Sequence, residues 1–311
     1  MSIERILGNL VLRDEVFGRL RDGGWSPLGH HPPGELFEEL LRLNEEGLLD
    51  WMLNAGEVIL DGARPMLPVV GGSFARAALP TMSASLEAVR PILEQAGSAV
   101  GRLEYGVERR VAGTGWLVEV PGQGGLVVTN RHVALRFGKR TDAGPDFRHD
   151  LDNRPVPVAM ELKAEGNMVE SWRVPVTQIL HVEPDSGPDL ALLRLAPRAT
   201  TPPPIRLGDA VAVGSDIAVI GFSTDNPGDS ADNILLGGRF GFKTLSPGTV
   251  TQVEAARIAH DASTTPGFSG APVLDFQGRA VGVHFAGEKR VANFAVTVET
   301  LRQFLAVGIP A

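Results

Sequence analysis

The sequence predicts a mainly β protein in which two consecutive β-barrels follow an α-helical N-terminal domain. The chain has 311 residues, enough for about two domains, with 37 glycines, 23 prolines and only 6% aromatic residues. This composition is typical of short strands joined by many tight turns. The spacing of apolar residues also changes near Gly106, from a helical period to short β-like runs. A proline-rich connector at 198–204 divides the β-like half into two blocks.

The first hundred residues carry the helical pattern. Apolar side chains recur every three or four residues, and Gly-Gly or Pro-Pro-Gly sequences separate the stretches. Residues 61–80 contain several prolines and glycines and are expected to form a strap or linker. Pro91 is expected to break or kink the last helix. The helical stretches are expected at 3–20, 32–43, 48–60 and 83–100.

The remaining residues carry the β pattern. Short apolar runs alternate with glycine and proline turns, and a short helix is expected at 301–307. We therefore assign residues 1–104 to the helical domain and 105–311 to the β domain, with barrels at about 105–197 and 205–300. The expected strands are at 111–118, 126–129, 190–195, 211–220, 249–253, 271–273, 280–285 and 293–298.

Charge and cysteine content exclude several classes of function. The formal net charge of -8 gives no electrostatic footprint for nucleic acid or an anionic membrane. The absence of cysteine excludes disulfides, a thiol nucleophile and cysteine-based zinc sites. No run of about 18 apolar residues occurs, and charges interrupt the N-terminus, so we expect neither membrane insertion nor a signal peptide. We therefore expect a soluble, cytoplasmic protein that uses no cofactor or metal.

Three short segments, 127–133, 188–192 and 264–273, carry side chains suited to nucleophilic catalysis. They place His132, Asp189 and Ser269 in that order. A serine hydroxyl is a poor nucleophile until a base such as histidine removes its proton, and a buried carboxylate fixes the imidazole tautomer. Gly267 permits a sharp turn that would direct the N–H groups of Gly267 and Ser269 at a developing oxyanion. Each segment alone is compatible with an ordinary strand end or turn, so the hypothesis depends on the ordered set.

These segments resemble those of the chymotrypsin-fold serine endopeptidases, over roughly residues 105–308. The order His, Asp, Ser is that of this fold and differs from the orders in subtilisins and α/β-hydrolases. The resemblance implies a double β-barrel of chymotrypsin type with the cleft between the barrels. It also implies that His132 is the general base, Asp189 the orienting acid and Ser269 the nucleophile. Gly267 and Ser269 would supply the oxyanion hole.

Within that family, the chain is most similar to the glutamyl endopeptidases and related disulfide-free bacterial trypsin-like peptidases. At the two positions where glutamyl enzymes carry a threonine and a histidine in the specificity pocket, this chain has Thr264 and His284. The resemblance implies that they bind a substrate carboxylate. Where trypsin-type enzymes carry an aspartate, this chain has Ser263, which argues against a preference for Arg or Lys. Unlike the glutamyl enzymes, the chain has a long N-terminal extension in place of a processed amine.

Two interpretations of the whole chain remain open. In the first, an active endopeptidase acts on protein or peptide substrates, and the helical domain regulates or recruits through a protein partner. In the second, the peptidase is catalytically degenerate or secondary, and the chain is a signalling adaptor that binds through a helical face. The complete set of His132, Asp189 and Ser269 favours the first.

Overall fold

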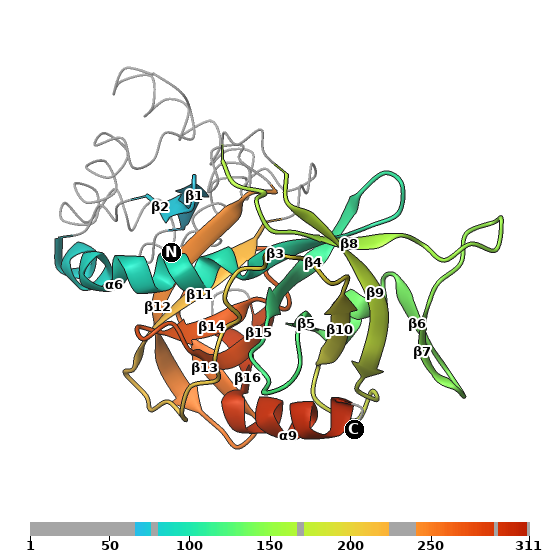
Figure 1. Ribbon diagram of the computed structural model, residues 1–311. Coiled ribbons are helices and arrows are strands. Elements are labelled where there is room, and N and C mark those ends of the chain that lie inside the picture. The colour runs from blue at the N-terminus through green and yellow to red at the C-terminus, as the bar shows by residue number, and fades with distance from the viewer. Residues whose placement is uncertain (1–65, 76–79, 167–170, 224–240, 289–291, 310–311) are drawn as a thin grey trace, which may run out of the picture.

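The computed structural model describes residues 66–75, 80–166, 171–223, 241–288 and 292–309. The helices expected at 3–20, 32–43 and 48–60 lie outside these residues, so the predicted helical domain is described only in its last part. The described chain forms two β-barrels side by side, with helix α6 (Pro80–Ser98) along one of them and helix α9 (Val298–Gly308) at the C-terminal end (Figure 1).

The first barrel closes from six strands, and large apolar side chains such as Trp116, Leu103 and Met160 fill its interior at 0% exposure. Its first strand begins at Val100, within the segment that the sequence assigned to the N-terminal domain. A separate two-stranded ribbon, β6 (Gly138–Thr141) and β7 (Gly144–Phe147), extends from this barrel. In spatial order the barrel strands are β10 (Ala191–Leu195), β5 (Leu126–Thr129), β4 (Arg110–Leu117), β3 (Val100–Tyr105), β8 (Val158–Glu161) and β9 (Arg173–Val182).

The second barrel follows the connector at 198–204 and also closes from six strands, because β11 pairs with both β12 and β14. Phe268, Val273 and Ile217 lie in its core at 0% exposure. The prediction of two β-barrels is confirmed. In spatial order the strands are β11 (Asp216–Phe222), β14 (Pro272–Asp275), β15 (Ala280–Glu288), β16 (Ala292–Thr297), β13 (Arg257–His260) and β12 (Lys243–Val253).

A short N-terminal hairpin, β1 (Leu67–Val70) and β2 (Ser73–Phe74), extends the sheet of the second barrel. Leu67 of β1 pairs with Leu245 of β12. The strap or linker expected at 61–80 is here a hairpin, in which Leu67, Val69 and Phe74 are buried while Val70 is exposed.

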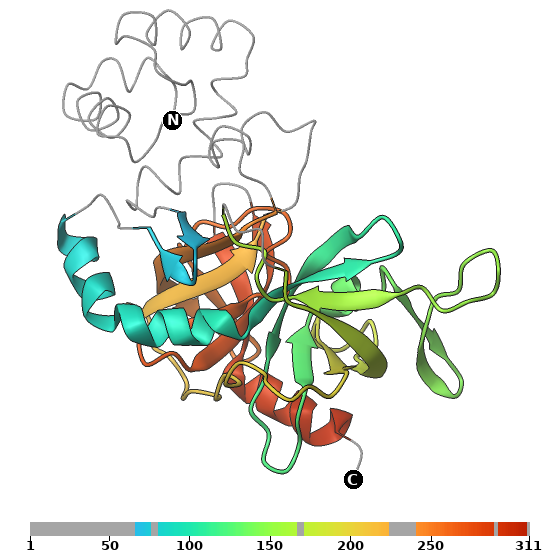
Figure 2. The same ribbon diagram turned by 45° about the horizontal axis from the view of Figure 1, so that its top comes forward.

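Helix α6 follows the hairpin and is continuous through Pro91. The helix bends along its length as it passes the second barrel (Figure 2), as expected for an internal proline that removes one backbone hydrogen bond. Leu86 and Leu93 bury at 1% and 0% exposure, which fixes the helix to the rest of the molecule.

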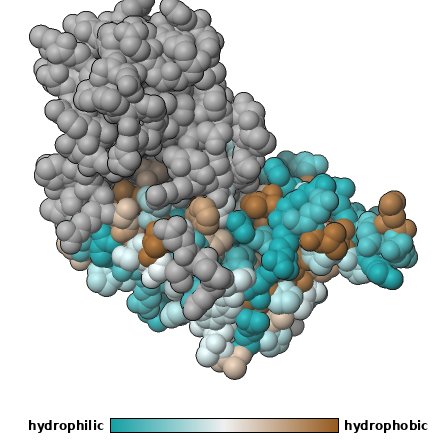
Figure 3. All heavy atoms as spheres, turned by 90° about the horizontal axis from the view of Figure 1, so that it is seen from above, coloured by the Kyte–Doolittle hydropathy of each residue, from teal (hydrophilic) through white to brown (hydrophobic). Residues whose placement is uncertain are grey.

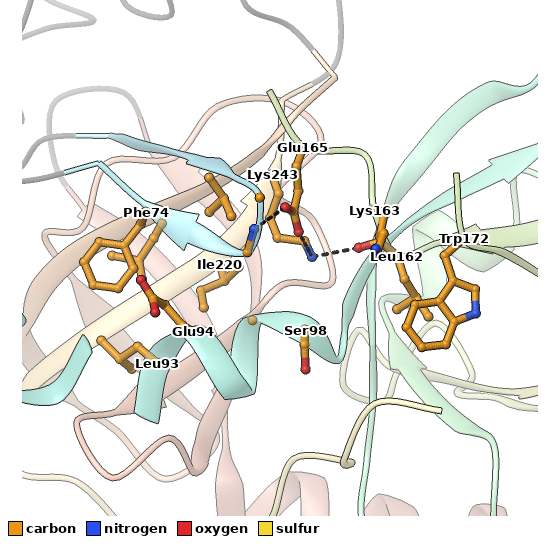
Figure 4. A pocket seen from close by; sticks show the side chains of 15 residues that line it. Phe74, Leu93, Glu94, Ser98, Leu162, Lys163, Glu165, Trp172, Ile220 and Lys243 are labelled. Carbon is orange, nitrogen blue, oxygen red and sulfur yellow. Dashed lines mark hydrogen bonds and ion pairs between the residues drawn. The ribbon is translucent and has the colours of Figure 1, made fainter. Parts of the chain in front are cut away.

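A pocket between α6, the hairpin and β12 contains a buried ion pair (Figure 4). Lys243 Nζ lies 3.2 Å from Glu165 Oε1 and donates a hydrogen bond of 2.8 Å to the Leu162 carbonyl. The backbone N–H of Gly72 donates to Glu165 Oε2 over 2.6 Å. Burial lowers the pKa of Lys243, and the charge of Glu165 opposes that shift. The ion pair therefore links the N-terminal hairpin to the start of β12.

The described surface has no single large apolar area on the face seen in Figure 3, where hydrophobic residues occur as small, separated areas. The exposed large apolar side chains are likewise scattered along the chain, for example Val107, Leu151 and Val307. Among the described residues, no helix has the length and apolar character needed to span a membrane.

Candidate active site

The strand pairing of the first barrel brings His132 and Asp189 together. Strands β5 and β10 are antiparallel neighbours, with Thr129 opposite Ala191. His132 lies just after β5, on the short helix α7 (Arg131–Ala134), and Asp189 lies just before β10. Both residues therefore emerge at the same end of one strand pair, although they are far apart in sequence.

Two hydrogen bonds join this pair. His132 Nδ1 lies 2.6 Å from Asp189 Oδ2, and the His132 backbone N–H donates to Asp189 Oδ1 over 3.1 Å. The carboxylate is 16% exposed and the imidazole 42% exposed, so the acid is shielded while the ring is accessible. Burial alone would raise the pKa of Asp189, but the bonds from His132 and the charges of His132 and Arg131 hold it below its usual value. An ionised Asp189 favours the tautomer with the proton on Nδ1.

Two neighbours of His132, to which the sequence motif alone assigned no role, fix the segment that carries Asp189. Asn130 Nδ2 donates to the Asp189 carbonyl over 2.8 Å, and Asn130 is fully buried. The Arg131 guanidinium donates to the carbonyls of Pro184 and Gly187, at 2.6 and 3.0 Å. The three consecutive residues 130–132 thus all contact the 184–189 segment. In the sequence, only the side-chain types of Asn130 and Arg131 could have indicated this role, since amide and guanidinium groups readily donate hydrogen bonds to loop carbonyls.

Ser269 lies on a tight turn that leads into β14. Phe268 N–H donates to the Thr265 carbonyl over 3.1 Å, and Ala271 N–H donates to the Phe268 carbonyl over 2.8 Å. The turn needs glycine at both sides of the Phe-Ser pair, because Gly267 and Gly270 have φ of 103° and 89°. The half-buried Ser269 therefore lies at the tip of a turn whose backbone only glycine adopts without strain.

This turn packs directly on the first barrel. A Cβ placed on Gly270 would overlap the Thr114 carbonyl and the Thr129 hydroxyl. A Cβ placed on Gly113 would lie 2.7 Å from Val133 Cγ2 and 2.9 Å from the Ser269 carbonyl. Gly113 thus separates Ser269 from Val133, the residue next to His132. The second-barrel turn and the His132 helix are therefore held on either side of one glycine of β4.

The hydrogen bonds of the described residues join His132 to Asp189 but do not join the Ser269 hydroxyl to His132. A long serine–histidine distance is common without substrate. In the same described set, the N–H groups of Gly267 and Ser269 donate to no backbone carbonyl. No group of three or more metal-ligating side chains occurs among the described residues.

The two residues expected in the specificity pocket lie on different elements. His284 is on β15 at 4% exposure, and Thr264 precedes the Ser269 turn. The Thr264 hydroxyl donates to Asn293 Oδ1 over 2.8 Å, and Asn293 Nδ2 in turn donates to the Ala262 carbonyl over 2.7 Å. Asn293, which the sequence motifs did not indicate, thus fixes Thr264. Ser263 is buried, at 5% exposure.

His284 lies against a second buried histidine, His260 at the end of β13. Their ring centroids are 5.5 Å apart in an edge-to-face arrangement. Burial lowers the pKa of His260 to about 3 and, with the charges of His260 and His132, lowers that of His284 well below its usual value. Both rings are therefore neutral at neutral pH in the free protein. Three of their four ring nitrogens, all except His284 Nε2, have no hydrogen-bond partner within the described structure.

Comparison with known proteins identifies the family. The model of the trypsin-like peptidase domain matches residues 113–283, more than half of the chain. The chain belongs to this family of trypsin-like peptidases. It is accordingly a serine endopeptidase, a hydrolase whose substrates are proteins or peptides. The match begins in β4 and ends in β15, so it includes all three segments found in the sequence.

Individual relatives agree with this assignment. A probable serine protease of Lysobacter enzymogenes is 27% identical, over 87% of this peptidase and 82% of that protein. A glutamyl endopeptidase of Staphylococcus epidermidis is 26% identical over 39% of this chain and 42% of its own length. The crystal structure of Deg5 aligns with a TM-score of 0.51 and 21% identity, covering 74% of this chain and 97% of Deg5, which shows that the fold is shared.

Proposed function

We propose that this peptidase cleaves peptide bonds through an acyl-enzyme on Ser269, with His132 as general base and Asp189 as orienting acid. The observation that carries the proposal is the hydrogen-bonded pair His132 Nδ1 and Asp189 Oδ2, at 2.6 Å, beside a glycine-bounded turn that presents Ser269. With the proton of His132 held on Nδ1, Nε2 is the free basic nitrogen. It takes the proton of the Ser269 hydroxyl as the oxygen attacks the scissile carbonyl.

The remaining steps follow from the same groups. The negative charge on the former carbonyl oxygen is stabilised by the N–H groups of Gly267 and Ser269. The protonated His132 then gives its proton to the leaving amine, which releases the first product and leaves an ester on Ser269. Water, activated by His132, hydrolyses the ester and restores the free hydroxyl. The ionised Asp189 stabilises the imidazolium in both halves of the reaction.

Covalent labelling tests this proposal. A fluorophosphonate should add once per chain of the purified full-length protein, and peptide mapping should place the adduct on Ser269. Ser269→Ala should not be labelled and should lose hydrolysis of an ester substrate by orders of magnitude. Equal ester hydrolysis by Ser269→Ala and wild type would show that another group is the nucleophile, and absence of labelling in the wild type would favour the adaptor interpretation.

We further propose a preference for glutamate before the scissile bond. The partial similarity to a glutamyl endopeptidase, and the presence of Thr264 and His284 at the expected positions, support it. Because His284 is neutral in the free protein, its imidazole carries no positive charge until it takes up a proton. A bound carboxylate would favour that proton, so acidic substrates should be cleaved with greater preference at lower pH.

A peptide library digested at two pH values and analysed by mass spectrometry tests the preference. Cleavage after Glu should predominate, weaken as pH rises, and fall far more in His284→Ala than cleavage after Ala or Leu does. Cleavage mainly after Leu, Ala or Val, unchanged in His284→Ala, would mean that the pocket is apolar and that His284 has no part in specificity.

We also propose that residues 1–104 regulate the peptidase or recruit a protein partner, rather than take part in the chemistry. The similarity to the Lysobacter protein covers 87% of the chain and therefore extends beyond the two barrels. The buried contact of the hairpin with β12 gives this region a physical connection to the second barrel. Affinity capture with Ser269→Ala, compared with the same protein lacking residues 1–65, tests recruitment. Identical captured proteins would contradict it.

A further inference from the structure

Thr114 of β4 makes four hydrogen bonds to three other segments. Its backbone N–H donates to the Ser269 carbonyl over 2.9 Å, and its hydroxyl donates to the Gly267 carbonyl over 2.8 Å. The hydroxyl also accepts from the Phe222 backbone N–H at 3.2 Å, and the Thr114 carbonyl accepts from the Thr129 hydroxyl at 2.7 Å. The side chain is 0% exposed. One buried residue of the first barrel thus holds both ends of the Ser269 turn.

The Thr114 hydroxyl binds the peptide group that follows Gly267, a residue with a flexible backbone. Gly267 has φ of 103°, and a glycine can rotate its following peptide at little cost because it lacks a Cβ. The hydrogen bond from Thr114 Oγ1 fixes the Gly267 carbonyl toward the first barrel. That carbonyl belongs to the Gly267–Phe268 peptide, which lies between the peptide carrying the Gly267 N–H and the peptide carrying the Ser269 N–H, so fixing it restricts the relative orientation of these two donors.

Resting on the proposed acyl-enzyme mechanism, we propose that the Thr114 hydroxyl is a positioning residue for the oxyanion hole. It touches neither substrate nor reacting atoms and acts through the Gly267 peptide. Its second bond, from Phe222 N–H of β11, orients the hydroxyl so that its own proton points at Gly267. Strand β4 of the first barrel and strand β11 of the second therefore together orient the hydrogen bond from Thr114 to the Gly267 carbonyl.

The surrounding packing prevents water from replacing this hydroxyl. A Cβ placed on Gly270 would overlap the Thr114 carbonyl, and one placed on Gly113 would lie 2.9 Å from the Ser269 carbonyl. A Cβ placed on Gly221, the residue before Phe222, would lie only 2.6 Å from the Phe268 ring. Removing the hydroxyl would consequently leave the Gly267 carbonyl and the Phe222 N–H without partners.

Two substitutions at Thr114 test the proposal, because they separate the effect of the hydroxyl from the effect of side-chain shape. Thr114→Val keeps the shape and removes the hydroxyl, whereas Thr114→Ser keeps the hydroxyl. We expect Thr114→Val to lower kcat about 10- to 100-fold with KM nearly unchanged, less than the roughly 10²–10³-fold loss on deleting an oxyanion donor. Thr114→Ser should remain within about threefold of wild type. The rate of fluorophosphonate addition should fall in parallel with kcat, because the phosphoryl oxygen occupies the same site.

All rates are expressed per site titrated by the fluorophosphonate, so that unfolded protein does not count. If Thr114→Val does not fold, Thr114→Ala gives the same comparison with Thr114→Ser without placing a methyl group against the Gly267 carbonyl. A kcat of the valine or alanine variant equal to that of the serine variant would overturn the role of Thr114 and leave the mechanism intact. A rise in KM alone would also overturn it. Failure of the wild type to be labelled at Ser269 would overturn both.

Discussion

At the scale of single residues, substitution of Asp189 is the most direct test of its proposed role in orienting His132. Asp189→Asn keeps the shape of the side chain but reverses the hydrogen-bonding preference at His132 Nδ1. We expect kcat to fall about 10⁴-fold, because the imidazole then favours the wrong tautomer. Steady-state kinetics on a small ester measures this, and an unchanged melting temperature serves as the control. A loss of less than tenfold would mean that Asp189 does not orient the base.

The two buried histidines predict a pH dependence of stability. His260 and His284 are neutral in the folded protein, with pKa values lowered by burial, to about 3 for His260. Below the unfolded value of about 6.5 the unfolded chain binds protons that the folded chain cannot. Each histidine should therefore lower the free energy of unfolding by up to about 1.4 kcal/mol per pH unit as pH falls from 6.5.

Urea unfolding at several pH values between 7 and 4 measures this dependence. His260→Phe fills a similar space without a titrating group, and its unfolding free energy should fall less steeply than that of the wild type. Parallel curves for His260→Phe and wild type would mean that His260 takes up its proton while folded.

At the scale of elements, two glycine substitutions separate the effect of the close contact between the Ser269 turn and β4 from the effect of backbone strain. Gly270 and Gly122 both have positive φ, of 89° and 75°, but only Gly270 lacks room for a Cβ. Gly122→Ala should cost about 1–2 kcal/mol of stability and leave activity unchanged. Gly270→Ala should cost more and also abolish ester hydrolysis, because the turn must move away from Thr114. Equal effects in thermal unfolding would mean that strain alone requires the glycine.

The ion pair beneath the hairpin gives a second prediction at this scale. Glu165→Gln leaves the buried Lys243 charge without its ion-pair partner, so we expect a loss of about 3–5 kcal/mol in unfolding free energy. Adding Lys243→Met should restore part of that loss. The exposed pair of Arg110 and Glu108, each 67% exposed, is the control, and Glu108→Gln should leave the unfolding midpoint unchanged. No recovery in the double variant would mean that Glu165 acts mainly through Gly72 N–H.

Some features of the fold and of the candidate site could be predicted from the sequence, and others could not. His132, Asp189 and Ser269 each lie in a contiguous motif, so they could be found without a structure, whereas Thr114 acts through partners far away in sequence. Strand β9 was not predicted because the exposed Thr177 and Gln178 interrupt its apolar residues and it contains Pro175. The expected strand at 211–220 begins only at Asp216, since the earlier residues form a turn. The hairpin was missed because its partner, Leu245, lies far along the chain.

At the scale of the whole molecule, the N-terminal hairpin and α6 are expected to stabilise the second barrel rather than supply chemistry. A chain beginning at Ala99 exposes Ile220 and Leu245, each at 1% exposure in the full protein. We expect its melting temperature to fall by at least about 6 °C relative to a chain beginning at Met66, for a loss of about 3 kcal/mol or more. Ester hydrolysis per titrated site should be equal in the two chains. Lower activity per site in the shorter chain would place α6 or the hairpin within the catalytic machinery.

The pairing of β1 with β12 also orders events while the chain is being synthesised. The ribosome releases Leu67 long before Leu245, so β1 can pair early with β2 but must wait for its second partner, β12. By contrast, β5 and β10 are both complete before Ser269 is translated, and His132 can already meet Asp189. Under the proposed mechanism, a nascent chain that ends before Ser269 thus holds base and acid together without a nucleophile. Hydrolytic capability then arises only after the second barrel has been translated and has closed, with the waiting strand β1 paired against it.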